Sequence, residues 1–159
     1  MSNPAEPSPA RIVADSDVLA ADLLADGPAR ECLDYVRAHS WLTLVASDAL
    51  LDDAAAVIER LTDASLATDW RDRVAELREP VDHPAGDHPA LASAYHGGAM
   101  HVLSFDERLT GATGNTLVRD RVETAVRPPD AFARLFDPEA LYPEVADGEY
   151  PGPDRDPRA

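Results

Sequence analysis

The chain has 159 residues, 45% of them hydrophobic, which is enough for one domain with a buried core. Thirty acidic residues face fourteen basic ones for a net charge of −16, and every basic residue is an arginine. The single cysteine, Cys32, excludes an intrachain disulfide, and no apolar run reaches the roughly 18 residues of a transmembrane helix. Because the N-terminus also lacks the apolar stretch of a signal peptide, we expect a cytoplasmic protein without a membrane segment.

The acidic charge indicates a high-salt environment. A small domain needs far less net charge for solubility, and like charges repel one another in dilute buffer. In about 1 M salt the Debye length shortens to roughly 3 Å, and most of that repulsion disappears. We therefore expect a halophilic protein whose stability falls when salt is removed.

The first half of the chain predicts two strands, each followed by two helices. Residues 1–10 are polar and rich in proline, so we expect them to form a disordered lead. Short apolar runs predict the strands, and apolar residues that repeat at helical spacing predict the helices. The predicted elements are a strand at 11–14, helices at 18–24 and 29–39, a strand at 41–46, a long helix that starts at Ser47 or Asp48, and a helix at about 67–79.

The second half of the chain contains a helix, a buried strand and several loops. Pro89 suits the first turn of a helix that Asp87 or His88 would cap, and the glycines at 97–98 end it. The predicted elements here are a link or short strand at 81–85, the helix from Pro89, a strand at 100–104, a glycine loop at 110–115, a partly helical segment at 117–126 that ends in a strand, and a short helix at 129–136.

Strands that alternate with helices predict an α/β fold in which helices flank both faces of a parallel sheet of four to five strands. We place the folded domain at residues 11–136. The remaining residues, 137–159, form an acidic tail with recurring prolines, and we expect its last dozen residues to be disordered.

Two of the predicted strands are followed closely by an aspartate. Asp15 comes directly after the first strand, and Asp106 lies just past the strand at 100–104. A third aspartate, Asp87, stands at the head of the preceding helix. In open α/β sheets ligands gather outside the carboxyl ends of the strands, and Mg²⁺ prefers carboxylate oxygens. The sequence therefore predicts a metal site at this edge of the sheet.

Three stretches of sequence match the motifs of one known family. IVADSDVL at 12–19 matches an apolar strand followed by Asp-Thr/Ser-Asn-apolar-Leu, with Asp17 where Asn is usual. From Asp87 the chain has Leu four residues on, Ala seven on, a Gly-Ala turn, an apolar strand and the ending SFDERL at 104–109. VRPPDAF at 126–132 matches a strand-Pro-x-Phe motif. In order and spacing these motifs resemble the PIN-domain nucleases over nearly all of the predicted domain.

The resemblance implies a PIN-like three-layer sandwich that acts as a metal-dependent endoribonuclease. Phosphodiester hydrolysis needs an activated water and stabilisation of a developing negative charge, and bound divalent metals supply both. The fourth family acid is usually a Glu on the helix after the second strand, and the spacing from Ser47 favours Asp53 over Asp52. The implied site has Asp15, Asp53, Asp87 and Asp106 as catalytic acids, the first, third and fourth of which hold Mg²⁺ or Mn²⁺; Ser16, Asp17, Asp52 and Ser104 support them; and Arg108 and Arg127 contact phosphate.

Members of the family include RNA-processing nucleases and the toxins of toxin–antitoxin pairs. The resemblance therefore implies RNA as the substrate and leaves open an antitoxin, another protein partner or a homodimer. A second interpretation is a catalytically inactive PIN-like module that binds RNA or protein, because the usual Glu is missing and the acidic surface is unlike that of most nucleic-acid-binding proteins.

Other interpretations of these residues also stay open. VADSD at 13–17 resembles the opening of haloacid-dehalogenase phosphatases, although the chain lacks the lysine that those enzymes normally use. The histidines near the repeated DHPA could form a zinc site with neighbouring aspartates, although their spacing matches no closed zinc pattern. Each aspartate could also simply cap a helix or a turn, and each arginine could pair with a nearby acid. The histidines in question are His83, His88, His96 and His101.

Overall fold

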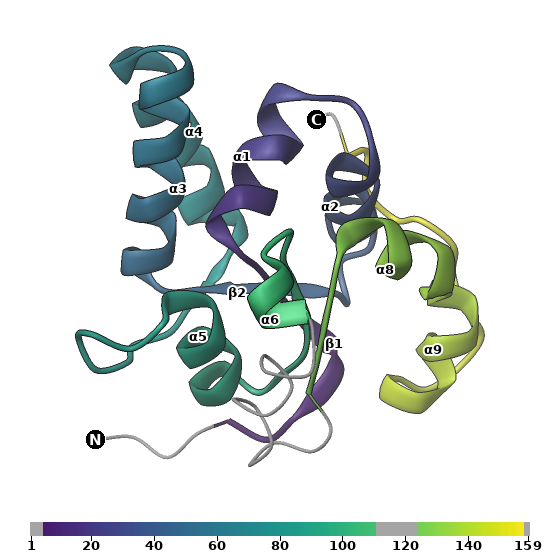
Figure 1. The fold of residues 1–159 in the computed structure, drawn as a ribbon. Coiled ribbons are helices and arrows are strands. Elements are labelled where there is room, and N and C mark those ends of the chain that lie inside the picture. Colours follow the sequence, from purple (N-terminus) through teal and green to yellow (C-terminus); the bar gives the residue numbers. More distant parts are fainter. Residues whose placement is uncertain (1–4, 111–123, 158–159) are drawn as a thin grey trace.

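The computed structural model describes residues 5–110 and 124–157, and its centre is a five-stranded sheet (Figure 1). Every strand pairs in parallel with its neighbours, in the order β3-β2-β1-β4-β5. The predicted α/β fold with a parallel sheet is therefore confirmed. The strands are β1 (Ser8–Ala14), β2 (Thr43–Ala46), β3 (Glu79–Pro80), β4 (Ala99–Leu103) and β5 (Ala125–Arg127).

Helices flank this sheet on both sides. Figure 1 shows α1, α3 and α4 on one side of β2 and α5 on the other. This agrees with right-handed crossovers, because the chain moves outward from β1 to β3 and then returns through α5 to β4. The helices are α1 (Ser16–Leu24), α2 (Pro28–Ala38), α3 (Asp48–Leu61), α4 (Ala64–Leu77), α5 (Pro89–Gly97), α6 (Glu107–Thr110), α8 (Pro129–Leu135) and α9 (Pro138–Val145).

The central strands are apolar on both faces, as expected for a sheet that is covered on both sides. Ile12, Val13 and Val102 are fully buried. Helix α5 approaches the sheet closely, and a Cβ added at Gly97 would lie 2.3 Å from Val45 Cγ1. The absence of a side chain at Gly97, the last residue of α5, therefore permits this close contact with β2.

The N-terminal boundary differs from the prediction. Strand β1 begins at Ser8, whose N–H donates to the carbonyl of Gly98 (2.9 Å), and the N–H of Ala5 donates to the carbonyl of His96 (3.0 Å). Residues 5–10 are therefore held along α5 and β4, and the prediction of a disordered lead is wrong for them; residues 1–4 lie outside the described residues.

The C-terminal boundary differs as well. Helix α9 follows α8 directly, and the chain then folds back onto the end of α2. The Tyr150 hydroxyl lies 2.6 Å from His39 Nε2, the Ser40 N–H donates to Asp154 Oδ1 (2.7 Å), and Arg155 Nη2 donates to the carbonyls of Val36 and His39 (3.0 Å each). The predicted domain end at residue 136 and the predicted disorder of the last dozen residues are wrong as far as residue 157.

Two further predictions can be placed only in part. The third strand is the short β3 rather than a segment at 81–85. Apart from Thr110, which ends α6, the predicted glycine loop at 110–115 lies outside the described residues, as does most of the ambiguous segment at 117–126. In the described part of the chain, no helix has the length and apolar character needed to cross a membrane.

Candidate functional site

The ends of β1 and β4 bring two of the predicted acids to the same edge of the sheet. These strands are neighbours, and the N–H of Asp15 donates to the carbonyl of Leu103, the last residue of β4, at 2.8 Å. Asp15 is only 8% exposed, whereas the Asp106 side chain lies at the surface with 26% exposure. The predicted convergence of these two strand ends is therefore present.

Ser104 links the two acids. Its side chain is fully buried; the hydroxyl donates to Asp15 Oδ2 (2.9 Å) and accepts from the N–H of Asp106 (3.0 Å). Asp15 Oδ1 also accepts from the N–H of Ser16 (2.8 Å), so Asp15 is the N-cap of α1. Asp15 therefore both caps α1 and lies at the candidate site, and the hydrogen bond from Ser104 fixes the orientation of its carboxylate.

Asp17 completes what we call the acid corner, the group Asp15, Asp17 and Asp106. Its carboxylate accepts from the N–H of Val18 (2.7 Å) and from the N–H of Phe105 in the β4–α6 turn (3.2 Å). Burial raises the pKa of Asp17, and the negative charges of Asp15 and Asp106 raise it further. The charges of Asp15 and Asp106 are thus close enough to act on Asp17, and a bound cation would relieve this repulsion.

Arg108 is the counter-ion of Asp106 in this structure. Its Nη2 lies 3.0 Å from Asp106 Oδ2, its Nε lies 3.2 Å from Oδ1, and its own backbone N–H donates to Oδ1 at 2.9 Å. These interactions lower the pKa of Asp106, and a smaller contribution comes from His88. Because the Arg108 side chain is 87% exposed, its guanidinium can leave the carboxylate without any repacking of the core.

The other predicted acids do not join the corner as ligands. Asp87 is exposed, and its neighbour His88 is the residue whose charge acts on Asp106. Asp52 points to α4, where its carboxylate binds Arg71 Nε (2.9 Å), and Asp53 is exposed on α3. Among the described residues, no group of three or more His, Cys, Asp or Glu side chains is arranged to hold a metal ion.

The chain belongs to a family of unknown function, DUF7384, whose model matches residues 6–158. No curated protein and no solved structure matches the chain. The matched region includes the C-terminal segment that folds back onto α2.

The side chain of Arg127, a predicted phosphate contact, lines a cavity that shares no residue with the acid corner. The backbone carbonyl of Arg127 accepts from the N–H of Ser104 (3.1 Å), whereas the cavity, of about 180 Å³, lies beside α8 and is also lined by His101 and Phe132. Burial and then the charge of Arg127 lower the pKa of His101 to about 4. Arg127 therefore faces a different part of the molecule from Arg108.

The histidines do not support the zinc interpretation. His101 packs its ring against Phe132, with ring centroids 5.2 Å apart, while His96 packs against Tyr95. His83 Nε2 lies 2.9 Å from the Ser47 hydroxyl at the end of β2. These side chains have separate partners, and the described residues contain no His-based metal cluster.

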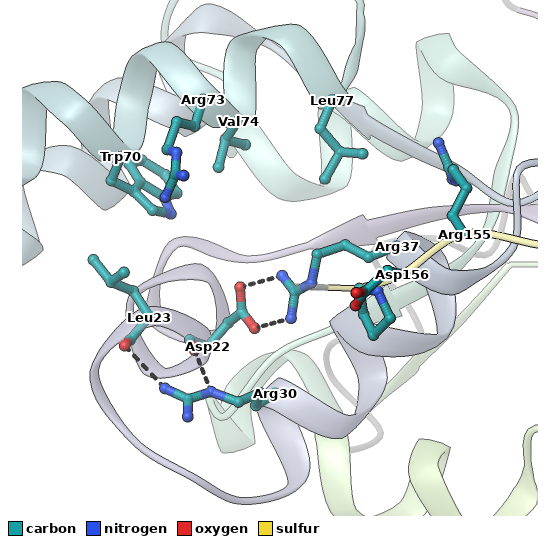
Figure 2. A pocket seen from close by; sticks show the side chains of 11 residues that line it. Asp22, Leu23, Arg30, Arg37, Trp70, Arg73, Val74, Leu77, Arg155 and Asp156 are labelled. Carbon is teal, nitrogen blue, oxygen red and sulfur yellow. Dashed lines mark hydrogen bonds and ion pairs between the residues drawn. The ribbon is translucent and has the colours of Figure 1, made fainter. Parts of the chain in front are cut away.

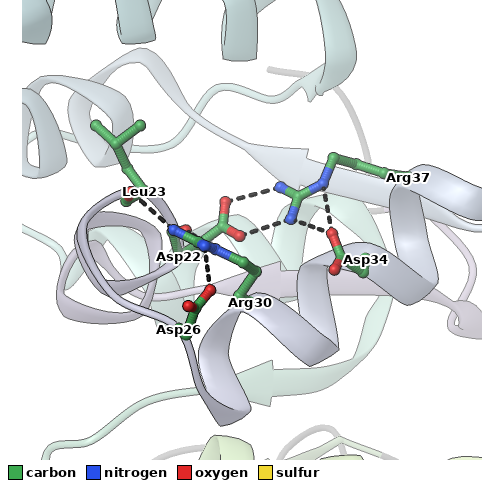
Figure 3. A network of polar contacts seen from close by, with 6 residues as sticks. All are labelled: Asp22, Leu23, Asp26, Arg30, Asp34 and Arg37. Atoms are coloured by element: carbon green, nitrogen blue, oxygen red, sulfur yellow. Dashed lines mark hydrogen bonds and ion pairs between the residues drawn. The ribbon is translucent and has the colours of Figure 1, made fainter. Parts of the chain in front are cut away.

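A second buried carboxylate, Asp22 in α1, was not expected from the sequence. It is 9% exposed and accepts two hydrogen bonds from Arg37 of α2, at 2.6 and 2.7 Å (Figure 3). Arg37 Nη2 also binds Asp34 (2.6 Å), while Arg30 donates to the backbone carbonyl of Asp22 (3.0 Å). Burial alone would lower the pKa of Arg37, but its hydrogen bonds with Asp22 and Asp34 raise it.

The Asp22–Arg37 pair could have been suspected in part. Asp22 follows Val18 by four residues in α1, which places it on the buried face of an otherwise apolar helix. The sequence does not indicate its partner, since Arg37 is 15 residues away on a different helix. This pair also lines the larger of two cavities described here, which lies between α4 and the α1–α2 helices (Figure 2).

Proposed function

We propose that the acid corner binds a divalent cation, Mg²⁺ or Mn²⁺, and that the protein is a metal-dependent endoribonuclease of PIN type. The observation that carries this proposal is the Ser104 hydroxyl, which joins Asp15 to the backbone of Asp106 across two strand ends. The position also agrees with the rule that ligands bind beyond the carboxyl ends of parallel strands.

The residues of the corner suit such a cation by chemistry and charge. Carboxylate oxygens are the hard ligands that Mg²⁺ prefers, and Mg²⁺ commonly uses one or two carboxylates and keeps several waters. Asp15 and Asp106 would supply the first ligands, and Asp17 would add negative charge beside them. Asp87 is not a member of the corner, so the proposed site has fewer acids than the family pattern implies.

Each residue has a definite task in this proposal. A bound divalent cation would lower the pKa of a water molecule and offset the negative charge that develops on phosphate. Ser104 and the N–H of Ser16 hold the Asp15 carboxylate in one orientation. Arg108 neutralises Asp106 when no cation is bound. When a cation takes its place at Asp106, the Arg108 guanidinium would bind an RNA phosphate beside the corner.

A catalytically inactive PIN-like module is the second candidate. The observation that favours it is the ion pair between Asp52 and Arg71, together with the exposed position of Asp53. Without an acid from α3 the corner has fewer carboxylates than the family pattern implies, and in this second interpretation a cation bound there serves only to hold a ligand.

RNA cleavage in about 1 M KCl with Mn²⁺ or Mg²⁺ tests the proposal. This salt concentration shortens the Debye length and thereby reduces the self-repulsion of the acidic chain. The wild-type chain is compared with Asp106→Asn and with the control Asp72→Asn, an exposed aspartate of α4. We expect metal-dependent cleavage that falls by about 100-fold or more in Asp106→Asn and is unchanged in Asp72→Asn.

Calorimetric titration with Mn²⁺ separates the candidates. Mn²⁺ binding that requires Asp106, without cleavage, would favour the non-catalytic module. Absence of Mn²⁺ binding would overturn the metal site itself. A stable phosphoaspartate on Asp15, detected by mass spectrometry after incubation with a phosphate donor, would instead support the phosphatase interpretation.

A further inference from the structure

The larger cavity has a volume of about 670 Å³ and lies on the α4 side of α1 and α2 (Figure 2). This volume falls within the range of pockets that bind small molecules, roughly 300–1,000 Å³. None of its lining residues belongs to the acid corner. The lining residues are Asp22, Leu23, Arg30, Arg37, Trp70, Arg73, Val74, Leu77, Arg155, Asp156 and Pro157.

The charge of this lining is opposite to that of the whole chain. Four arginines line the cavity against two aspartates, whereas the full sequence has 14 basic and 30 acidic residues. The arginines come from three separate segments: two from α2, one from α4 and one from the C-terminal segment. The C-terminal segment adds one cation and one anion, Arg155 and Asp156, so the net positive charge of the lining comes from the helices.

The arginines differ in how far their donors are already used. Arg37 binds Asp22 and Asp34, and Arg30 binds Asp26 and two backbone carbonyls, so these two side chains are largely occupied. Arg73 is exposed and, within residues 5–110 and 124–157, has no hydrogen-bond or ion-pair partner. Arg73 is therefore the cation at this cavity that is most available to a ligand.

Arg155 also has donors to spare. Its Nη2 donates to the carbonyls of Val36 and His39 at 3.0 Å each, which fixes the position of the guanidinium at the end of α2. An arginine has five N–H donors, so those on Nε and Nη1 remain for another acceptor. A fixed guanidinium loses little side-chain entropy when it binds an anion.

The wall formed by α4 carries an apolar stretch beside Arg73. Trp70, Val74 and Leu77 follow one another at helical spacing along α4, and Figure 2 shows them on one side of the cavity with Asp22 and Arg37 across from them. The Asp22–Arg37 pair is bidentate and nearly buried, so it forms a rigid polar floor. A ligand that fits both walls must have an apolar body and an anionic group.

We propose that this cavity binds a small organic phosphate whose body is a flat, apolar ring system. The ring packs along Trp70 and Val74, and the phosphate is bound by the guanidinium of Arg73. A doubly charged phosphate suits this lining, because arginine recognises phosphate through paired, charge-assisted hydrogen bonds. The proposal is independent of the acid corner, with which the cavity shares no residue.

The test is a calorimetric titration of the full chain in about 1 M KCl with phenyl phosphate as the probe. We expect saturable binding with one site, at least about tenfold weaker in Arg73→Gln because one charge-assisted contact is lost. Arg60→Gln, which changes an exposed arginine of α3 outside the cavity, should bind like the wild type.

Fluorescence gives a second measurement of the same site. The chain has two tryptophans, so Trp41→Phe leaves Trp70 as the sole reporter, and phenyl phosphate should change its emission with the calorimetric affinity. Phenol, which lacks the anionic group, should bind at least about tenfold more weakly. The proposal is overturned if the unmodified chain shows no saturable binding, or if Arg73→Gln and Arg60→Gln bind phenyl phosphate equally well.

Discussion

Two aspartates in α1 or at its start are buried to nearly the same extent but have opposite surroundings. Asp15 is 8% exposed and Asp22 is 9% exposed. Asp22 faces the guanidinium of Arg37 with two hydrogen bonds, whereas Asp15 is held by a hydroxyl and an N–H beside two further carboxylates. Burial alone therefore does not distinguish a structural carboxylate from a candidate ligand.

The difference lies in where the neutralising charge comes from. Removing a carboxylate from water is costly, and at Asp22 the fold itself supplies the compensating cation. At Asp15 the neighbouring charges that the structure describes are negative, and Arg108 binds Asp106 from an exposed position. The negative charge of the acid corner is therefore only partly neutralised by the described residues, whereas Arg37 neutralises the charge of Asp22.

The largest expected effect is at the structural pair. Asp22→Asn leaves Arg37 with only Asp34 as a carboxylate partner, and we expect the free energy of unfolding to fall by about 3 kcal/mol. Urea unfolding in about 1 M KCl measures this change. The matched control is Asp26→Asn, whose side chain is 92% exposed and pairs with Arg30; its cost should stay within about 0.5 kcal/mol. Equal effects of the two substitutions would show that the buried Asp22–Arg37 pair stabilises the fold no more than the exposed Asp26–Arg30 pair.

The second effect concerns the acid corner and its cation. Mn²⁺ at about 100 times its Kd should raise the free energy of unfolding of the wild-type chain by about 2.7 kcal/mol, because it binds only the folded state. Asp106→Asn should lose most of this gain, whereas Asp22→Asn should keep it despite its lower stability. Thermal unfolding with and without Mn²⁺ gives both numbers. An equal gain in wild type and Asp106→Asn would place the cation elsewhere.

The sequence predicts the strands that carry the corner better than the residues that surround it. The buried strands β1 and β4 are recognisable as apolar runs, and each is followed closely by an aspartate. Strand β3 is not recognisable in the sequence, because Glu79 and Pro80 form a two-residue strand at the edge of the sheet without any apolar pattern. For Asp87, local spacing alone could not decide between a ligand and a helix start, and the structure makes its neighbour His88 the N-cap of α5.

The C-terminal segment shows a limit of reasoning from composition. Its prolines and acids are typical of disorder, yet Tyr150, Asp154 and Arg155 bind the end of α2. A helix end carries carbonyls without helical partners, and a single arginine can satisfy two of them. This complementarity depends on tertiary structure and leaves no periodic signal in the sequence.

A smaller effect is expected at the resident counter-ion of the corner. Arg108→Gln frees Asp106 from its guanidinium, so Mn²⁺ should bind the variant about threefold or more tightly, since the competing cation is gone. The unfolding midpoint should not change, because exposed ion pairs contribute little to stability. Calorimetric titration with Mn²⁺ measures the affinity, and Arg60→Gln controls for the change in net charge. Weaker Mn²⁺ binding in Arg108→Gln would show that Arg108 supports the corner in some other way.

The smallest effect is a pH dependence that belongs to Asp17. Burial and the charges of Asp15 and Asp106 raise its pKa in the folded state, so the folded protein takes up this proton more readily than the unfolded chain does. Without divalent cations, Asp17 therefore lowers stability near neutral pH, and its penalty disappears as the pH falls through the raised pKa. We expect Asp17→Asn to be more stable than wild type at pH 7, with the difference shrinking towards pH 4.

Urea unfolding of both chains across this pH range, in EDTA, isolates the effect of Asp17. Adding Mn²⁺ should remove the difference in stability at pH 7, because the cation supplies the missing positive charge. A wild-type chain that is the more stable one at pH 7 in EDTA would mean that the hydrogen bonds from Val18 and Phe105 outweigh the repulsion, and that the corner has no need of a cation.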